Sequence, residues 1–166
     1  MAKSGGGAKG KGNTEDAGFK VVARNRRARH EFDLLEKVEA GIVLTGTEVK
    51  SLRNGKASLE ESYAAVDAGE VWLLGCDIPE YTEANRMNHK PKRPRKLLMH
   101  RREIGKFAGK ASERGFTLVP LRMYFKNGKA KVELAVARGK RLHDKRQSQR
   151  KSEAQKEIRR EMKNRR

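Results

Sequence analysis

The apolar residues of this chain gather between positions 19 and 138, and most of them are spaced as in β-strands. Between positions 32 and 44 they come in short runs, which Gly41 and Gly46 interrupt as bends or bulges in a curled sheet would. The stretch TEVKSL (47–52) alternates loosely between apolar and polar residues, and LRNGKAS (52–58) has the composition of a turn. We therefore expect strand-like pieces separated by turns in this part of the chain.

Two hairpins are predicted further along. In the first, apolar segments flank Asp67-Ala68-Gly69-Glu70, where Gly69 can take a positive φ. In the second, two alternating segments meet at Lys126-Asn127-Gly128-Lys129, and Asn-Gly is the strongest short-range sign of a hairpin. The apolar residues on one face of its second strand are Val132, Leu134 and Val136.

Helical spacing is found in one longer segment and one short one. In 96–115 the apolar residues that recur at helical intervals are Leu97, Ile104, Phe107, Ala108 and Ala111. Gly115 can end this helix. The short segment SLEESY (58–63) can form a single helical turn, with Ser58 as N-cap and Glu61 as its capping-box partner.

These patterns predict a mainly β fold with about six short strands and one helix. A small closed barrel suits such glycine-bent strands because it leaves no sheet edge exposed. We expect an OB-like barrel over residues 19–138, a fold that commonly carries RNA on its surface. Residues 1–18 are rich in Gly and Lys and are predicted to be a disordered extension.

Residues 139–166, which we call the tail, have a different pattern. They hold twelve Lys/Arg and four Asp/Glu, with apolar side chains too sparse to form a core. Ala154, Ile158 and Met162 fall at i, i+4 and i+8, a stripe narrower than that of a core-facing helix. We expect the tail to be disordered when free and helical when bound to a polyanion.

Charge identifies the class of partner. Forty Lys+Arg against 21 Asp+Glu give a net charge of +19, and a polyanion is the usual partner of such a chain because each neutralised phosphate releases counterions. Membrane binding would require a wide apolar helix face or a long apolar run, and neither is present. The N-terminus lacks the apolar core of a secretory signal. These features predict a cytosolic protein without a membrane partner.

The sequence carries no sign of catalysis or of a metal site. There is no nucleophile–base arrangement and no phosphate-binding glycine loop between a strand and a helix. Adjacent carboxylates at Glu60 and Glu61 diverge on a helix and favour a solvated surface. The single cysteine, Cys76, lies in an apolar stretch and is predicted to be a buried, inert thiol. The four histidines lack ligand spacing, so neither an enzyme nor a bound cofactor is expected.

Three basic clusters are candidate RNA-binding segments. The first is RNRRARH (24–30), where arginine forks suit phosphates and bases, and where Asn25 can either read a base edge or hold a loop. A solvated lead-in strand is the alternative reading of this cluster. The second, 89–102, has seven Lys/Arg and two His. In it Leu97 and Leu98 suit the core, although an exposed leucine could pack on a base. The third, ARGKRLHDKR (137–146), includes His143, which can stack on RNA.

The segments NRRARHEF, EAGIVLTGTEVKSLRNGKAS, RKLL and ARGKRLHDKR together resemble the SsrA-binding protein family, SmpB. This similarity runs from about residue 23 to residue 146. It implies an OB-like barrel that binds the tRNA-like part of transfer-messenger RNA and delivers it to stalled ribosomes for trans-translation. The tail would enter the empty messenger channel near the decoding centre. Implied partners are transfer-messenger RNA, the stalled 70S ribosome through its 16S rRNA, and elongation factor Tu through the RNA.

The resemblance also assigns residues. It places Asn25, Glu39 and Leu98 where the family contacts RNA, although Glu39 could equally form a structural ion pair. Together with the basic clusters, the candidate RNA-binding set is Arg24, Asn25, Arg26, Arg27, Arg29, His30, Glu39, Arg95, Lys96 and Leu98. The candidate contacts near the decoding centre are Arg138, Gly139, Lys140, His143, Asp144, Lys145 and Arg146. A general RNA chaperone or a ribosomal protein that binds rRNA is the alternative function.

Overall fold

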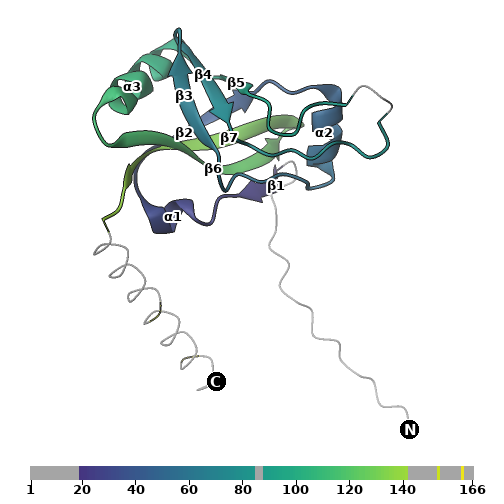
Figure 1. Ribbon diagram of the computed structural model, residues 1–166, viewed down its shortest axis with the longest axis horizontal. Helices are drawn as coiled ribbons and strands as arrows, with labels where there is room; N and C mark the ends of the chain where they lie inside the picture. The colour runs from purple at the N-terminus through teal and green to yellow at the C-terminus, as the bar shows by residue number, and fades with distance from the viewer. Residues whose placement is uncertain (1–18, 85–87, 142–152, 154–161, 163–166) are drawn as a thin grey trace.

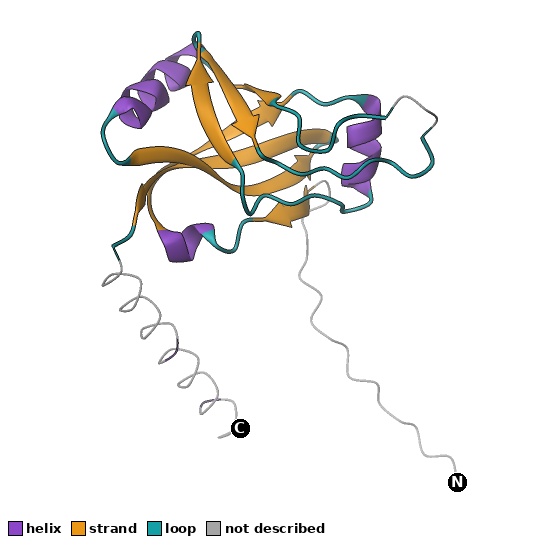
Figure 2. Ribbon diagram, viewed as in Figure 1, coloured by secondary structure: helices purple, strands orange, loops and turns teal. Residues whose placement is uncertain are grey.

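The computed structural model describes residues 19–84, 88–141, 153 and 162. Figure 2 shows the strands and helices in these ranges, and the fold is mainly β with flanking helices, as predicted. The elements are β1 (Phe19–Arg24), α1 (Ala28–Glu31), β2 (Phe32–Ile42), α2 (Gly46–Arg53), β3 (Tyr63–Asp67), β4 (Glu70–Leu74), β5 (Arg95–Leu98), α3 (Arg101–Ser112), β6 (Phe116–Lys126) and β7 (Lys129–Gly139). The predictions for residues 1–18 and for most of the tail lie outside the described residues.

The strands form one antiparallel sheet that curls back on itself. Its order is β1-β6-β3-β4-β5-β2-β7, and β7 also pairs with β6. The strands from β6 through β3, β4, β5, β2 and β7 therefore make a ring, with β1 added beside β6 (Figure 1). The ring is thinnest between β3 and β6, which share the single pair Ala64–Leu118.

Both predicted hairpins are confirmed. β6 and β7 pair from Phe116–Arg138 to Lys126–Lys129, and the turn residues Asn127 and Gly128 both have positive φ, 50° and 74°. The β3–β4 turn likewise has positive φ at Ala68 and Gly69, 47° and 76°. Positive φ at both central positions is the two-residue geometry that matches the twist of paired strands.

The main core fills the inside of the ring. On β7, Val132, Leu134 and Val136 are fully buried, as their spacing predicts. Cys76 is also fully buried, and burial raises the pKa of its thiol to about 11, so the thiol stays uncharged near neutral pH. This confirms the interpretation of Cys76 as an inert thiol.

A second, smaller apolar cluster lies under α1. Its buried members are Ala28, Val119, Leu121, Ala135 and Ala137, with Phe32 and Leu34 packed against them. β7 is therefore buried on both faces near its end, where Ala135 and Ala137 are fully buried on the face opposite Val136. Simple alternation along β7 does not predict this cluster.

The region between β2 and β3 differs from the prediction. Residues 47–52 were expected to be extended and 52–58 to be a turn, but Gly46–Arg53 form α2, in which Glu48 accepts a hydrogen bond from the backbone N–H of Thr45 at 2.7 Å. That contact belongs to a capping box, the device that was predicted instead for Ser58 and Glu61. Ser58 forms an isolated β-bridge with Asp77, and a turn closed by the bond from the Ser62 N–H to the Leu59 carbonyl at 3.3 Å replaces the predicted capped helical turn at 58–63.

The predicted helix at 96–115 begins later than expected. Its first residues belong to β5, where Leu97 is 2% exposed, and α3 starts after the N-cap residue His100. The pairing of β5 with both β2 and β4 overrides the apparent helical register of Leu97. Phe107 is buried and Ile104 and Ala111 pack against the core, so the predicted apolar face is confirmed at these three residues, whereas Ala108 is only half-buried.

No helix among the described residues is long and apolar enough to cross a membrane.

Candidate nucleic-acid interface

The first basic cluster is built around the short helix α1. Asn25, 7% exposed, accepts from the N–H of Ala28 through Oδ1 at 3.0 Å and donates to the carbonyl of Leu59 through Nδ2 at 3.0 Å. Its own N–H donates to the carbonyl of Leu121 at 2.8 Å. Asn25 thus holds the loop that begins α1, one of the two roles considered for it.

With Ala28 buried, the basic residues around it point outward. Arg26, Arg27, Arg29 and His30 are exposed, and Arg27 pairs with Glu31 at 3.0 Å, one helical turn away. An exposed i,i+4 pair contributes little stability, about 0.3–0.5 kcal/mol. The sequence in this cluster therefore forms a turn whose charged side chains are available to an anion.

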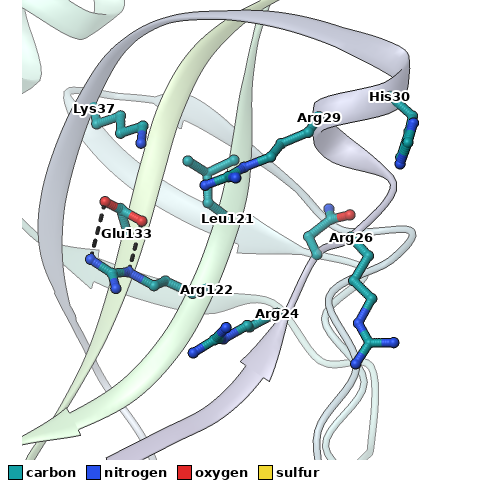
Figure 3. Close-up of a pocket in the computed structure, with 9 residues that line it drawn as sticks. Arg24, Arg26, Arg29, His30, Lys37, Leu121, Arg122 and Glu133 are labelled. Atoms are coloured by element: carbon teal, nitrogen blue, oxygen red, sulfur yellow. Dashed lines mark hydrogen bonds and ion pairs between the residues drawn. The ribbon is translucent and has the colours of Figure 1, made fainter. Parts of the chain in front are cut away.

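A hollow of about 570 Å³ lies between α1 and the outer surface of the sheet. Figure 3 shows Arg29 reaching from α1 toward Leu121, with Lys37 and the Arg122–Glu133 pair on the strands opposite. The Arg, Lys and His residues that line it, which we call the basic face, are Arg24, Arg26, Arg29, His30, Lys37 and Arg122. A concave surface with this many cations suits a phosphate backbone.

Arg122 is held in a fixed orientation within the basic face. Its Nε lies 2.8 Å from Oε2 of Glu133. Its guanidinium also lies 5.3 Å from the ring centroid of Tyr124 and 5.6 Å from that of Phe19. A guanidinium that is stacked and ion-paired loses less freedom on binding than a free one.

Glu39 sits beside this face in a network of cations. Its carboxylate accepts hydrogen bonds from Lys131 and from the hydroxyl of Tyr124, and Nζ of Lys126 lies 3.4 Å away. Hydrogen bonds from Lys131 and Tyr124 lower the pKa of Glu39 to about 2, so the carboxylate is ionised at neutral pH. Burial, together with the bond to Glu39, raises the pKa of Tyr124 far above its ordinary value.

Strand pairing brings the predicted residues onto one surface. Arg24 pairs with Arg122, Arg122 with Glu133, and Glu133 with Glu39, so these residues form a row across β1, β6, β7 and β2. Leu98 pairs with Gly41, two residues after Glu39 on the same face of β2, and is 54% exposed. Three of the predicted residues, Arg24, Glu39 and Leu98, are therefore on the same side of the sheet.

Arg95 has a different environment from the rest of the predicted set. Its side chain has no exposed surface. It pairs with Glu48 at 2.9 Å and donates to the carbonyls of Cys76 and Pro91 at 2.6 and 2.8 Å. A buried guanidinium with these partners is not available to RNA, so we assign Arg95 a structural role in place of the predicted contact.

The same buried network organises the loop before β5. Burial raises the pKa of Glu48, but hydrogen bonds from Arg93 and Thr45 and the charge of Arg95 outweigh it and keep that pKa below its ordinary value. His89, 7% exposed, bonds to Thr47 and to the carbonyl of Ile78. Lys96 pairs with Glu70 on the neighbouring strand. The second basic cluster is thus partly a structural network rather than a continuous RNA surface.

The third cluster begins where β7 ends. Arg138 is exposed, and its guanidinium lies 6.0 Å from the ring centroid of Phe116. Gly139 is the last residue of β7, and Lys140 returns toward α1. His143, Asp144, Lys145 and Arg146 lie outside the described residues.

Sequence reasoning missed Lys37, Tyr124 and Arg122, which complete this surface. Each is an isolated polar or aromatic residue on a strand and belongs to no basic run. The predicted two-residue turn at Asn127-Gly128 fixes the register of the hairpin and so implies that Arg122 lies opposite Glu133, a signal that was not used. The contact of Tyr124 with Glu39 joins residues far apart in the chain, and no local pattern indicates it.

Comparisons with a family model, with individual relatives and with solved structures all point to the same family. The sequence model of a family described as "SmpB protein" matches residues 22–164. An SsrA-binding protein from Saccharopolyspora erythraea is 58% identical over 148 residues, covering 89% of this chain and 94% of the relative. One from Acidothermus cellulolyticus is 57% identical over 143 residues, covering 86% and 90%. A chain in the solved structure "tmRNA-SmpB: a journey to the center of the bacterial ribosome" is similar with a TM-score of 0.62 and 48% identity, covering 72% of this chain and 84% of that one.

Proposed function

Because this chain belongs to the SmpB protein family, we propose that it binds transfer-messenger RNA and delivers it to ribosomes in trans-translation. Its relatives are named SsrA-binding proteins, and the similar solved structure is described as tmRNA-SmpB on the bacterial ribosome. The chain acts as an RNA-binding protein whose partners are transfer-messenger RNA and the ribosome.

The single observation in this molecule that supports the proposal best is the basic face. Five Lys or Arg side chains and His30 surround one hollow, and one of the arginines, Arg122, has its guanidinium over two aromatic rings. Phosphates would lie against Arg24, Arg26, Arg29 and Lys37. The exposed Leu98, on β5 next to β2, offers an apolar surface to an unstacked base.

The finer assignments extend this proposal. Arg27, His30, Lys96 and Glu39 belong to the proposed RNA-binding surface, with Glu39 acting by orienting Lys131 and Lys126. The tail enters the vacant messenger channel and contacts 16S rRNA near the decoding centre through Arg138, His143, Asp144, Lys145 and Arg146. Elongation factor Tu meets the complex through the RNA. The protein supplies no catalytic group of its own.

Deleting residues 147–166 tests this division of roles. We expect the truncated protein to keep its affinity for transfer-messenger RNA within about threefold, because the basic face is intact, and to lose tagging of nascent chains on stalled ribosomes. Affinity is measured by gel shift at fixed salt, and tagging in a purified translation system. A truncated protein that tags at the wild-type rate contradicts the role given to the tail.

The range of RNAs that the protein binds distinguishes the proposed function from the alternative, a general RNA chaperone. Sequencing the RNA that co-purifies with the full-length protein should yield one dominant species with a tRNA-like end. Equal recovery of tRNA, rRNA fragments and transfer-messenger RNA would instead favour a general RNA-binding role, since phosphate contacts alone carry no sequence information.

A further inference from the structure

The point where β7 leaves the barrel is tied to α1 by one lysine. The backbone N–H of Lys140 donates to the carbonyl O of Glu31 at 2.9 Å. Its Nζ donates to the carbonyl O of Arg29 at 2.9 Å and lies 3.6 Å from Oδ1 of Asp33. The side chain of Lys140 is only 12% exposed, so its ammonium is directed at the protein rather than at solvent.

These acceptors are the ones that a helix end provides. The last carbonyls of a helix have no partner within the helix, and a cation there is favourable both as a donor and through the helix dipole. α1 has only four residues, and its last turn already carries Arg29 and His30. A further positive charge in this place would be repelled unless the carbonyls and Asp33 held it, as they do here.

Lys140 is the last of three contacts that fix α1. Asn25 holds its beginning, through the N–H of Ala28. The side chain of Ala28, 1% exposed, packs this first turn against the second apolar cluster. Lys140 holds its end and is the second residue of the tail, so the helix that presents Arg29 shares an anchor with the tail.

We propose that Lys140 is a positioning residue that couples α1 to the start of the tail and so fixes the direction in which the tail leaves the barrel. It acts through the carbonyls of Arg29 and Glu31, not by contacting rRNA, and this replaces the contact near the decoding centre that the sequence predicts for it. The consequence for trans-translation rests on the proposed function, whereas the anchoring itself does not.

Spin-label distances in the full-length protein without RNA test the anchor directly. Native Cys76 is fully buried, so labels attach to the introduced cysteines of R141C and D67C, both at exposed positions. In Lys140→Met the distribution of the label–label distance should broaden. It should stay narrow in Lys129→Met, which removes the same charge at the exposed β6–β7 turn, and return to narrow in Lys140→Arg, which keeps a long cationic donor.

Two outcomes of this measurement would overturn the proposal. One is a distribution in Lys140→Met as narrow as in the wild type. The other is an equal broadening between labels at D67C and E113C, which lie at the ends of β3 and α3, because Lys140 would then support the whole folded body rather than the exit of the tail. Amide exchange of Glu31 and Phe32, about tenfold faster in Lys140→Met with β6 unchanged, is the expected companion result.

Function provides a second, separate readout. Lys140→Met should keep the salt dependence of transfer-messenger RNA binding, since Lys140 neutralises no phosphate, while tagging falls by about tenfold because the tail is misdirected. A salt slope smaller by about 0.7–0.9 would mean a direct phosphate contact and would refute the positioning role. If the wild type itself fails to bind this RNA, the proposed function fails, yet the label distances still decide the role of Lys140.

Discussion

At the scale of single residues, Glu39 shows how a carboxylate can serve a cationic surface. Its negative charge holds Lys131 and, at 3.4 Å, Lys126 in place while Tyr124 donates to it. Such a residue raises the density of ordered cations without being a cation itself. Its importance for RNA binding then follows from the groups it orients.

Acid titration of Glu39 gives a residue-scale prediction. Its pKa is about 2 in the folded protein against 4.5 for an ordinary glutamate, so the folded state gains stability from its ionised form above pH 4.5 and loses it as pH falls toward 2. Between pH 7 and pH about 2.5, the melting temperature of the wild type should fall further than that of Glu39→Gln.

Thermal unfolding followed by circular dichroism at the two pH values measures this difference. The control is Glu60→Gln, which removes an exposed carboxylate that has no ion pair among the described residues. An offset of Glu39→Gln from the wild type that is the same at both pH values would show that the ion pairs of Glu39 do not contribute to stability.

Arg95 and Lys96 show the limit of reading charge from sequence at this scale. They are neighbours in one basic run, yet strand alternation turns Arg95 into the core and leaves Lys96 at the half-exposed surface. The burial of Arg95 depends on Glu48, 47 residues earlier in the chain, which pairs with it at 2.9 Å. No local pattern in the run 89–102 indicates that partner.

At the scale of elements, the two hairpin turns follow from the local sequence, whereas the pairing of distant strands does not. Asn127-Gly128 and Ala68-Gly69 form the turns that their sequences predict. α2 was expected to be extended because TEVKSL alternates over six residues, a length at which helix and strand patterns overlap. The start of α3 was misplaced since β5 is recruited by β2 and β4, and contacts of that range are invisible in a short window.

Two glycines give an element-scale prediction because they share a backbone conformation and differ in surroundings. Gly75 and Gly128 have φ of 69° and 74°. A Cβ on Gly75 would lie 2.9 Å from the backbone O of Glu61, whereas one on Gly128 would meet nothing within 4 Å. Gly128→Ala should therefore cost about 1–2 kcal/mol in the free energy of unfolding, from the left-handed conformation alone.

Gly75→Ala should cost about 1–3 kcal/mol more than that, because the clash is with backbone and cannot be relieved by a rotamer change. Urea unfolding of the two variants, at equal m-values, compares them directly. Equal losses of stability would mean that the segment containing Glu61 shifts freely, against the close packing of this turn.

At the scale of the whole molecule, the cations behind the net charge of +19 differ in how available they are to a partner. Many cations are neutralised locally: Lys106 and Lys110 of α3 both pair with Glu36, and Lys96 pairs with Glu70. Arg24, Arg26 and Arg29 have no ion pair among the described residues and gather at one hollow. The barrel therefore offers RNA a directed surface rather than a general positive charge.

Salt titration of RNA binding tests this distribution. Removing one phosphate contact should lower the slope of log affinity against log salt by about 0.7–0.9, so Arg24→Ala and Arg29→Ala should each do so. Arg114→Ala, an exposed arginine just beyond α3, removes the same charge and should leave the slope unchanged. Equal effects of the three substitutions would show that net charge alone drives binding.

The single residue pair between β3 and β6 determines where the barrel opens most easily. We expect a ring of strands to open first where the fewest residue pairs join two neighbours, and here that place is Ala64 beside Leu118. Transient separation of β3 from β6 would let the β3–β4 hairpin move away from β6, with the three residue pairs between β4 and β5 acting as the hinge. The strands β1, β6, β7 and β2 would stay paired during this motion. The surface that they form would therefore keep its geometry, and a partner bound there would not be released.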